Sequence, residues 1–270
     1  DPLLIFGLGA IPGLGLTGAA VATLIGRGLG VAYQMRALRN GKSRIVLRGS
    51  LREVDARAMF TLLRLSVFGI SQFLIATASW LGLVRILAIF GSAALAGYTI
   101  ALRIIIVALL PSWGLSNAAA TMVGQSLGAK DPARAERAVW ITAFLNMGFL
   151  ALVSVFYIIF NHELVRIFTS EPAVVAAGAQ CLGIMSYGYI IYAWGMVMPQ
   201  AFNGAGDTMT PTKIYLFCFW LFEIPLAYLL AIGLGAAQAG VYWSVVAAES
   251  AAGIAGILIF RRGRWKETRI

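Results

Sequence analysis

The sequence predicts an all-α integral membrane protein. Of its 270 residues, 60% are hydrophobic and 12% are charged, whereas a soluble domain averages about 25% charged residues. The mean hydropathy is +0.85. Long unbroken apolar runs also disfavour a transmembrane β-barrel, whose strands show short segments of alternating polarity. Five runs are each near or above the roughly 20 apolar residues that cross a bilayer as one helix: Leu95–Met122, Val139–Phe160, Val174–Phe202, Ile214–Gly233 and Val241–Phe260.

Seven helices account for these runs, because turn residues separate them. Breaks fall at 39–42, at 128–132, at Ser170-Glu171-Pro172, and at 203–207 followed by Pro211. The predicted helices are Leu14–Arg36, Ala58–Leu81, Ala93–Gly124, Arg134–Phe160, Ala173–Phe202, Thr212–Ile232 and Ala239–Phe260. Pro111 and Pro199 lie inside two of them and mark candidate kinks or hinges.

The net charge of +10 is concentrated in alternate loops. One set of loops carries sixteen Lys and Arg residues, and the opposite set carries only Arg85 and Arg166. This asymmetry predicts a plasma (inner) membrane protein with a cytoplasmic C-terminus. The charge then reflects topology and contact with anionic membrane lipid, so we expect no nucleic-acid partner. The sixteen are Arg36, Arg39, Lys42, Arg44, Arg48, Arg52, Arg57, Lys130, Arg134, Arg137, Lys213, Arg261, Arg262, Arg264, Lys266 and Arg269.

A weak internal repeat suggests a larger architecture. When Gly15 is set against Gly240, five of about 22 positions are identical, and both segments end in a basic stretch. The offset of 225 residues contains six helices, so the segments are expected to be the sixth helices of two successive six-helix units. On this interpretation, and because the chain opens at Asp1 without an initiator Met, the first five helices are expected to be missing.

Residues 13–18 read G-x-G-x-x-G, which is also the pattern of a dinucleotide-binding loop. Such a loop needs a preceding strand and an acidic residue about 20 positions later, and neither is present here. A stripe of small residues explains the glycines better, because it lets membrane helices approach closely. Gly18, Ala22, Gly26 and Gly30 form this stripe, and Ala248, Ala252 and Gly256 repeat its spacing.

Glu223 and Glu249 are the most informative residues. Each is predicted to lie about 15 Å deep in its span, where a carboxylate is costly unless it is paired or wetted. One interpretation is a structural ion pair with Arg103 or Arg64. The other is that one or both bind a cationic substrate or a coupling ion, with Pro225 opening the helix nearby.

Other groups within the spans suggest a cavity for organic cations. Tyr187, Tyr189, Tyr192 and Trp194 can hold cations by cation–π contact, although aromatics in a helix bundle more often serve plain packing. Enzyme chemistry has little support, because His162 is the only histidine and no metal-ligand cluster or phosphate-binding loop is present. We therefore predict no enzyme, no metal and no cofactor. Cys181 and Cys218 lie in apolar runs and are expected to act as small hydrophobes.

Three strings resemble those of the multidrug and toxic compound extrusion (MATE) transporters, and the resemblance runs the whole length. They are Asp1-Pro2-Leu3-Leu4-Ile5-Phe6-Gly7 with residues 18–23, residues 123–129 with Pro132, Arg134 and Ala135, and residues 203–208 with Pro211. The resemblance implies the six-helix C-terminal lobe of a twelve-helix, two-lobe transporter, preceded by the last helix of the N-terminal lobe. The expected domains are 1–37 (end of the N-terminal lobe), 38–57 (cytoplasmic linker), 58–262 (C-terminal lobe) and 263–270 (basic tail).

The resemblance also implies a secondary antiporter that exports cationic or amphipathic compounds by alternating access, coupled to H⁺ or Na⁺. Its partners are then small organic cations, the coupling ion, membrane lipid and the missing N-terminal lobe. Several sodium-coupled relatives carry carboxylates at positions that correspond to about Ala76 and Tyr192 here, so the coupling groups differ in this chain. The predicted substrate- or ion-binding residues are Glu223, Glu249, Gln72, Tyr192, Trp194 and Arg103.

Three alternatives remain open at this stage. A lipid or oligosaccharide flippase would need a basic cavity, for which Arg64 and Arg103 are the candidates. An intramembrane enzyme would need a buried acid or nucleophile pair within reach. A non-transporting membrane subunit would need neither.

Overall fold

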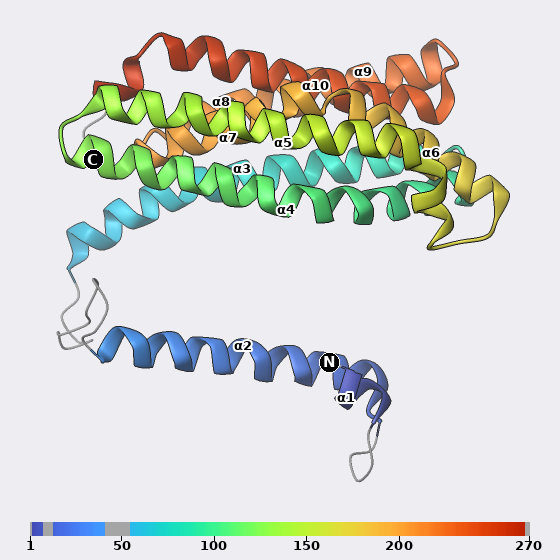
Figure 1. Ribbon diagram of the computed structural model, residues 1–270, viewed down its shortest axis with the longest axis horizontal. Helices are drawn as coiled ribbons and strands as arrows, with labels where there is room; N and C mark the ends of the chain where they lie inside the picture. The colour runs from blue at the N-terminus through green and yellow to red at the C-terminus, as the bar shows by residue number, and fades with distance from the viewer. Residues whose placement is uncertain (1, 8–12, 41–54, 268–270) are drawn as a thin grey trace. The chain divides into compact units, whose positions relative to one another are not determined.

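The computed structural model describes residues 2–7, 13–40 and 55–267, and its chain divides into two units, Asp1–Met59 and Phe60–Ile270. Every regular element in these described ranges is helical (Figure 1). Six of the helices there are long and apolar enough to cross a membrane, and a bent pair of shorter helices makes a seventh span if it is counted as one. The all-helical membrane fold that the sequence predicts is therefore confirmed.

The first unit contains a short helix α1 (Pro2–Phe6) and a long helix α2 (Gly15–Arg39). The N–H of Leu14 donates to the carbonyl oxygen of Leu4 at 3.0 Å, which folds the start of α2 back onto α1. A Cβ at Gly18 would lie 2.0 Å from the Leu4 oxygen, so this glycine permits the close approach expected of the small-residue stripe. Within this unit no described atom lies within 4 Å of a Cβ built at Gly26 or Gly30.

The second unit is built on long helices that run from end to end of a bundle (Figure 1). They are α3 (Ala56–Ala88, which begins before the unit boundary), α4 (Ser92–Gly128), α5 (Pro132–Arg166) and α10 (Ala237–Arg261). Helix α5 starts where the sequence supplies a cap: the Asp131 carboxylate accepts from the N–H of Arg134 at 2.9 Å, and Pro132 occupies the first turn. The sequence predicts that this helix ends at Phe160. In the structure Phe160 is only a kink, with φ −108° and ψ 18°, and the helix continues beyond it to Arg166.

The segment predicted as one helix over Ala173–Phe202 is two helices, α6 (Pro172–Tyr187) and α7 (Tyr189–Gly204), bent by 64°. The bend falls at Gly188, whose N–H donates to the Met185 carbonyl at 3.1 Å in a tightened turn. Pro199 lies inside α7 and Pro111 lies inside α4, and neither ends its helix. Membrane helices tolerate proline because neighbouring groups satisfy the freed carbonyl, whereas glycine is a poor helix former and leaves room at the bend.

The next span, Met209–Gly233, is helical throughout but changes its winding. It consists of α8 (Met209–Tyr215), a π-helical stretch η1 (Leu216–Glu223), α9 (Ile224–Tyr228) and a second π-helical stretch η2 (Leu229–Gly233). Pro225 has no N–H to donate to the preceding turn, and the first π-helical stretch, η1, ends at Glu223, two residues before it. A short 3₁₀ turn η3 (Arg264–Glu267) follows α10.

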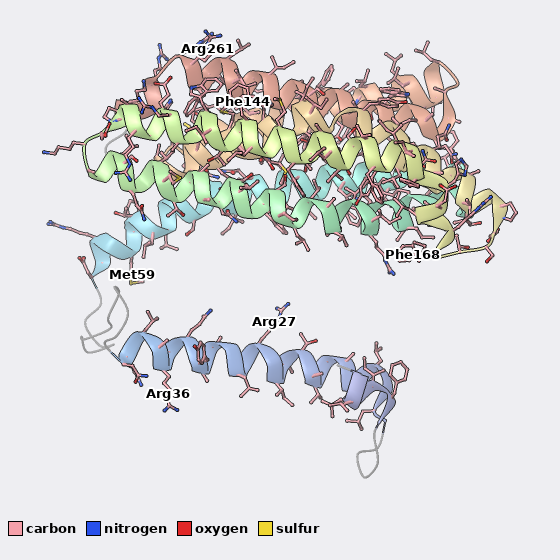
Figure 2. The ribbon with its side chains drawn as sticks, in the orientation of Figure 1. Arg27, Arg36, Met59, Phe144, Phe168 and Arg261 are labelled. Carbon is pink, nitrogen blue, oxygen red and sulfur yellow. The ribbon has the colours of Figure 1, made fainter. Side chains whose placement is uncertain are left out.

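The bundle core forms where α4 packs against α5, α6 and α7, and where α10 packs against α6 and α7. Small residues bring α10 and α7 together: Ala252 is 1% exposed, and a Cβ at Gly256 would lie 2.9 Å from the Met198 Cβ. The predicted small-residue stripe of α10 therefore packs inside the bundle. Large apolar side chains also cover the outside, as expected of a lipid-facing surface, and Figure 2 shows them radiating from the helices.

Candidate functional site

A cavity of about 220 Å³ lies within the second unit, among α3, α4, the α6–α7 bend, η1 and α10. Its walls are mostly apolar and aromatic, as is usual for a small-molecule site. No Lys, Arg or His stands among the described residues that line it. The lining residues are Ala76, Ser79, Trp80, Leu83, Tyr98, Leu102, Ile105, Ile106, Leu109, Met185, Gly188, Tyr189, Tyr192, Phe219, Glu223, Val245, Val246 and Glu249.

Both carboxylates that the sequence singles out line this one cavity. Glu223 ends η1, and Glu249 is the middle residue of α10. Because burial of a charged carboxylate among apolar groups is costly, two of them in one cavity need a partner, water or a ligand. The arrangement can therefore hold a cation or exchange protons.

Glu223 is hydrogen-bonded to a residue of α3. It is 4% exposed, and its Oε2 lies 2.8 Å from the hydroxyl oxygen of Ser79 on α3. The same hydroxyl lies 2.9 Å from the carbonyl oxygen of Phe219, one turn before Glu223. Ser79 is itself 2% exposed, so this cluster is shielded from bulk solvent.

Glu249 has a different environment. It is half-buried, and among the described residues it makes no hydrogen bond and no ion pair. Arg103, one of the two predicted partners, is exposed on α4, does not line the cavity and pairs with neither glutamate. The side chain of Arg64, the other predicted partner, lies outside the described residues. The structural ion pair with Arg103 is therefore not formed.

Of the remaining predicted site residues, the structure brings only Tyr192 to the cavity. Gln72 exchanges hydrogen bonds with the Asn203 side chain, both at 3.3 Å, so its amide joins α3 to the end of α7. Trp194 is 8% exposed and packs in the core, with its ring edge-on to Phe144 at 5.1 Å. Its indole N–H points at the Met147 sulfur, 3.3 Å away.

Several cavity residues carry no clear signal in the sequence. Ser79, Trp80 and Tyr98 lie in apolar runs where small hydroxyls and aromatics are common. Tyr189 also lines the cavity, is 4% exposed and has a hydroxyl with no hydrogen-bond partner among the described residues. A buried hydroxyl without a partner is costly, so this group is a further polar point for a bound molecule or water.

Two positions singled out by the resemblance meet in the same cavity. Ala76 and Tyr192 stand at about the places where sodium-coupled relatives carry carboxylates, and both line it. The two acidic residues of this cavity, Glu223 and Glu249, lie on other walls, which η1 and α10 form. No group of three or more His, Cys, Asp or Glu side chains suited to a metal ion occurs in the part of the chain that the structure describes.

A bundle of helices long and apolar enough to cross a membrane, packed around an acidic, aromatic cavity, defines a multi-pass membrane protein with an internal cavity. Residues 69–229 match the MatE family model, which is more than half of the chain, so the chain belongs to this family. It is a family of transporters and not of enzymes.

Relatives of known sequence agree with this assignment. The uncharacterized transporter YisQ of Bacillus subtilis is 27% identical over 265 residues, which are 97% of this chain and 57% of YisQ. The multidrug resistance protein NorM of Burkholderia vietnamiensis is 28% identical over 273 residues, covering 97% of this chain and 56% of NorM. The chain thus spans less than three fifths of the length of these curated relatives.

Solved structures show the same fold. An outward-facing multidrug resistance MATE family transporter superposes with a TM-score of 0.88 at 21% identity, over 99% of this chain and 60% of that one. The MATE transporter ClbM, solved in complex with Rb⁺, gives a TM-score of 0.82 at 21% identity, over 99% of this chain and 59% of ClbM.

Proposed function

We propose that the protein is a secondary antiporter that exports cationic or amphipathic small molecules in exchange for protons or sodium ions. Residues 58–262 supply its C-terminal lobe and residues 1–37 the end of its N-terminal lobe, joined by a linker at 38–57 and followed by a basic tail at 263–270. The antiporter lies in the plasma membrane with its C-terminus in the cytoplasm. The name of the NorM relative, which refers to multidrug resistance, supports export of drug-like small molecules.

One observation carries the proposal: two carboxylates share an aromatic cavity whose described lining contains no basic side chain. Such a cavity attracts a lipophilic cation through charge and through the faces of Trp80, Tyr98 and Tyr192. It repels a phosphate group, which argues against the lipid or oligosaccharide flippase. Arg103, one of the two basic residues considered for a flippase cavity, is outside this cavity.

The test is transport by the intact protein in proteoliposomes. Radiolabelled tetraphenylphosphonium, a lipophilic monovalent cation, is offered under an imposed pH gradient and, separately, under a sodium gradient. We expect gradient-driven transport in at least one case, and we expect the Glu223→Gln, Glu249→Gln double variant to abolish it. Glu163→Gln is the matched control, since it removes a carboxylate from the exposed end of α5.

Two results would contradict the proposal. Absence of gradient-driven transport would favour a non-transporting subunit. Transport unchanged by the double variant would show that the cavity carboxylates have no role in transport. Translocation of fluorescent phosphatidylglycerol, measured by its quenching with dithionite, would favour the flippase.

A further inference from the structure

The two glutamates share a cavity but differ in what holds them. Glu223 has a fixed partner, the Ser79 hydroxyl, and almost no exposed surface. Glu249 is half-buried and has no hydrogen-bond or ion-pair partner among the described side chains. Groups with such different surroundings perform different tasks, because a carboxyl that is fixed by a hydrogen bond suits a proton, whereas one without a protein partner suits a larger cation.

The Ser79 hydroxyl lies within hydrogen-bond distance of two oxygen atoms but has only one hydrogen to donate. Its oxygen is 2.8 Å from Glu223 Oε2 and 2.9 Å from the Phe219 carbonyl oxygen, and both spacings are those of O–H···O hydrogen bonds. A serine hydroxyl has one hydrogen, and a carbonyl oxygen has none. If the hydroxyl donates to Phe219, the hydrogen between Ser79 and Glu223 must come from the carboxyl group. In that arrangement the Ser79–Glu223 hydrogen bond exists only when Glu223 is protonated, whereas a hydroxyl that donates to Oε2 needs no proton on the carboxyl group.

The surroundings of this cluster contain acids and phenols. Glu249 faces Glu223 from α10, Tyr98 faces it from α4, and Cys218 precedes it on η1. Tyr189 and Tyr192 line the same cavity from α7. No described lysine, arginine or histidine in the lining neutralises a charge on Glu223. A proton or a bound cation is therefore the available source of compensation.

Glu249 lies among groups that suit an organic cation. Val245 and Val246 line the cavity one turn before it on α10, and Tyr192 faces it from α7. Because no described protein group occupies its oxygens, a cation that enters the cavity gains a charge contact without breaking an existing one.

From this contrast, and resting on the proposed transport function, we propose that Glu223 is the proton-binding group and Glu249 receives the cationic substrate, with Ser79 as the positioning residue for the proton. A cation bound at Glu249 favours the ionised form of Glu223, because opposite charges attract strongly in a site of low dielectric. The proton then leaves Glu223 for water, and its return favours release of the cation. In the ionised state the Ser79 hydroxyl turns to donate to the carboxylate.

Binding of tetraphenylphosphonium to the intact purified protein tests this division. Isothermal titration calorimetry in two buffers of different ionisation enthalpy gives both the Kd and the number of protons released. We expect the wild-type protein to release a proton on binding. Glu223→Gln should bind with a Kd within about threefold of wild type but release no proton, whereas Glu249→Gln should bind about tenfold or more weakly, because a charge-assisted contact is lost.

Ser79 is tested by the pH profile of binding, which a purely structural role would not move. Ser79→Ala should displace the midpoint of the pH dependence while the Kd at optimal pH stays near wild type, and Ser79→Thr, which keeps the hydroxyl, should restore the midpoint. Glu249→Asp keeps the charge and should bind with intermediate affinity, so weak binding by Glu249→Gln is not mistaken for misfolding.

The outcomes separate this inference from the function on which it rests. If the two variants show the reverse pattern, if both lose binding equally, or if Glu223→Gln still releases a proton, the division of tasks is overturned while the cavity remains the site. If neither variant changes the Kd or the proton release, the cavity is not the binding site and the proposed function fails with it.

Discussion

At the scale of single residues, one buried amide joins three helices. Asn146 on α5 is 0% exposed, accepts from the Ser112 hydroxyl on α4 and donates to the Ala193 carbonyl on α7 at 3.2 Å. Ser112 is also fully buried. Removal of the amide leaves these groups without their partner in an apolar core, which costs more than the hydrogen bonds themselves.

We expect Asn146→Ala to destabilise the protein by about 1–2 kcal/mol, since interhelical hydrogen bonds in membrane proteins are individually modest but unpaired buried groups add to the loss. Thermal unfolding in detergent measures the effect as a lower Tm. Asn161→Ala is the control, because the one hydrogen bond of the Asn161 side chain among the described residues goes to the Ile158 carbonyl of its own helix. Equal Tm values for the two variants would contradict the role of Asn146 as a tie between helices.

The cavity shows which residues can be identified from sequence alone. Glu223 and Glu249 stand out because a carboxylate in an apolar span is rare and costly. Ser79 has no such signal, since its role arises only when α3 lies against η1. Trp194 has the residue type expected of a cation site, but packing against Phe144 and Met147 holds it in the core. The sequence indicates which residues have suitable chemistry, whereas the direction in which a side chain points depends on neighbours far along the chain.

At the scale of elements, glycine sets how closely α4 and α7 approach. A Cβ built at Gly204, the last residue of α7, would lie 2.3 Å from the carbonyl oxygen of Ala120 on α4. The obstructing atom belongs to the backbone, so no side-chain movement can relieve the clash.

Gly204→Ala should therefore force the two helices apart and cost about 3 kcal/mol, at the upper end of overpacking effects. Gly148→Ala on α5 is the matched control, because no described atom outside its own stretch of helix lies within 4 Å of its added Cβ and alanine is the better helix former. We expect the first variant to lower the Tm in detergent and the second to leave it unchanged or slightly raised. An unchanged Tm for Gly204→Ala would show that α4 and α7 can move apart at little cost in stability.

Hydrophobic runs and turn residues predict most helices to within a few residues. The predicted Ala93–Gly124 is α4, Ser92–Gly128, and the predicted Ala239–Phe260 is α10, Ala237–Arg261. The bend at Gly188 is missed because a single glycine in an apolar run is common. The close approach of Val246 Cγ1, which would lie 3.1 Å from a Cβ added at Gly188, is visible only in the structure. The two π-helical stretches on either side of Pro225 are likewise not predicted from the sequence.

At the scale of the whole second unit, the bundle has two chemically different ends. Lys266 after α10 pairs with Glu136 at the start of α5 at 2.6 Å, which brings the basic C-terminal turn to the α4–α5 end. At the other end, Gln238 at the start of α10 donates to Gln180 on α6 at 2.8 Å. Arg261 and Phe168 mark these opposite ends in Figure 2. The positive-inside bias predicts that the α4–α5 end faces the cytoplasm.

Cysteine labelling tests this orientation. The two native cysteines, Cys181 and Cys218, are buried and free, so a background with both replaced by Ala offers no competing thiol among the described residues. Lys130→Cys lies exposed in the α4–α5 turn and Ser170→Cys lies exposed in the α5–α6 loop. We expect a membrane-impermeant maleimide to label only Ser170→Cys in intact cells and only Lys130→Cys in inside-out vesicles, with the background still active in transport. The reverse pattern would place the C-terminus outside, and labelling of both from one side would mean that α5 does not cross the membrane.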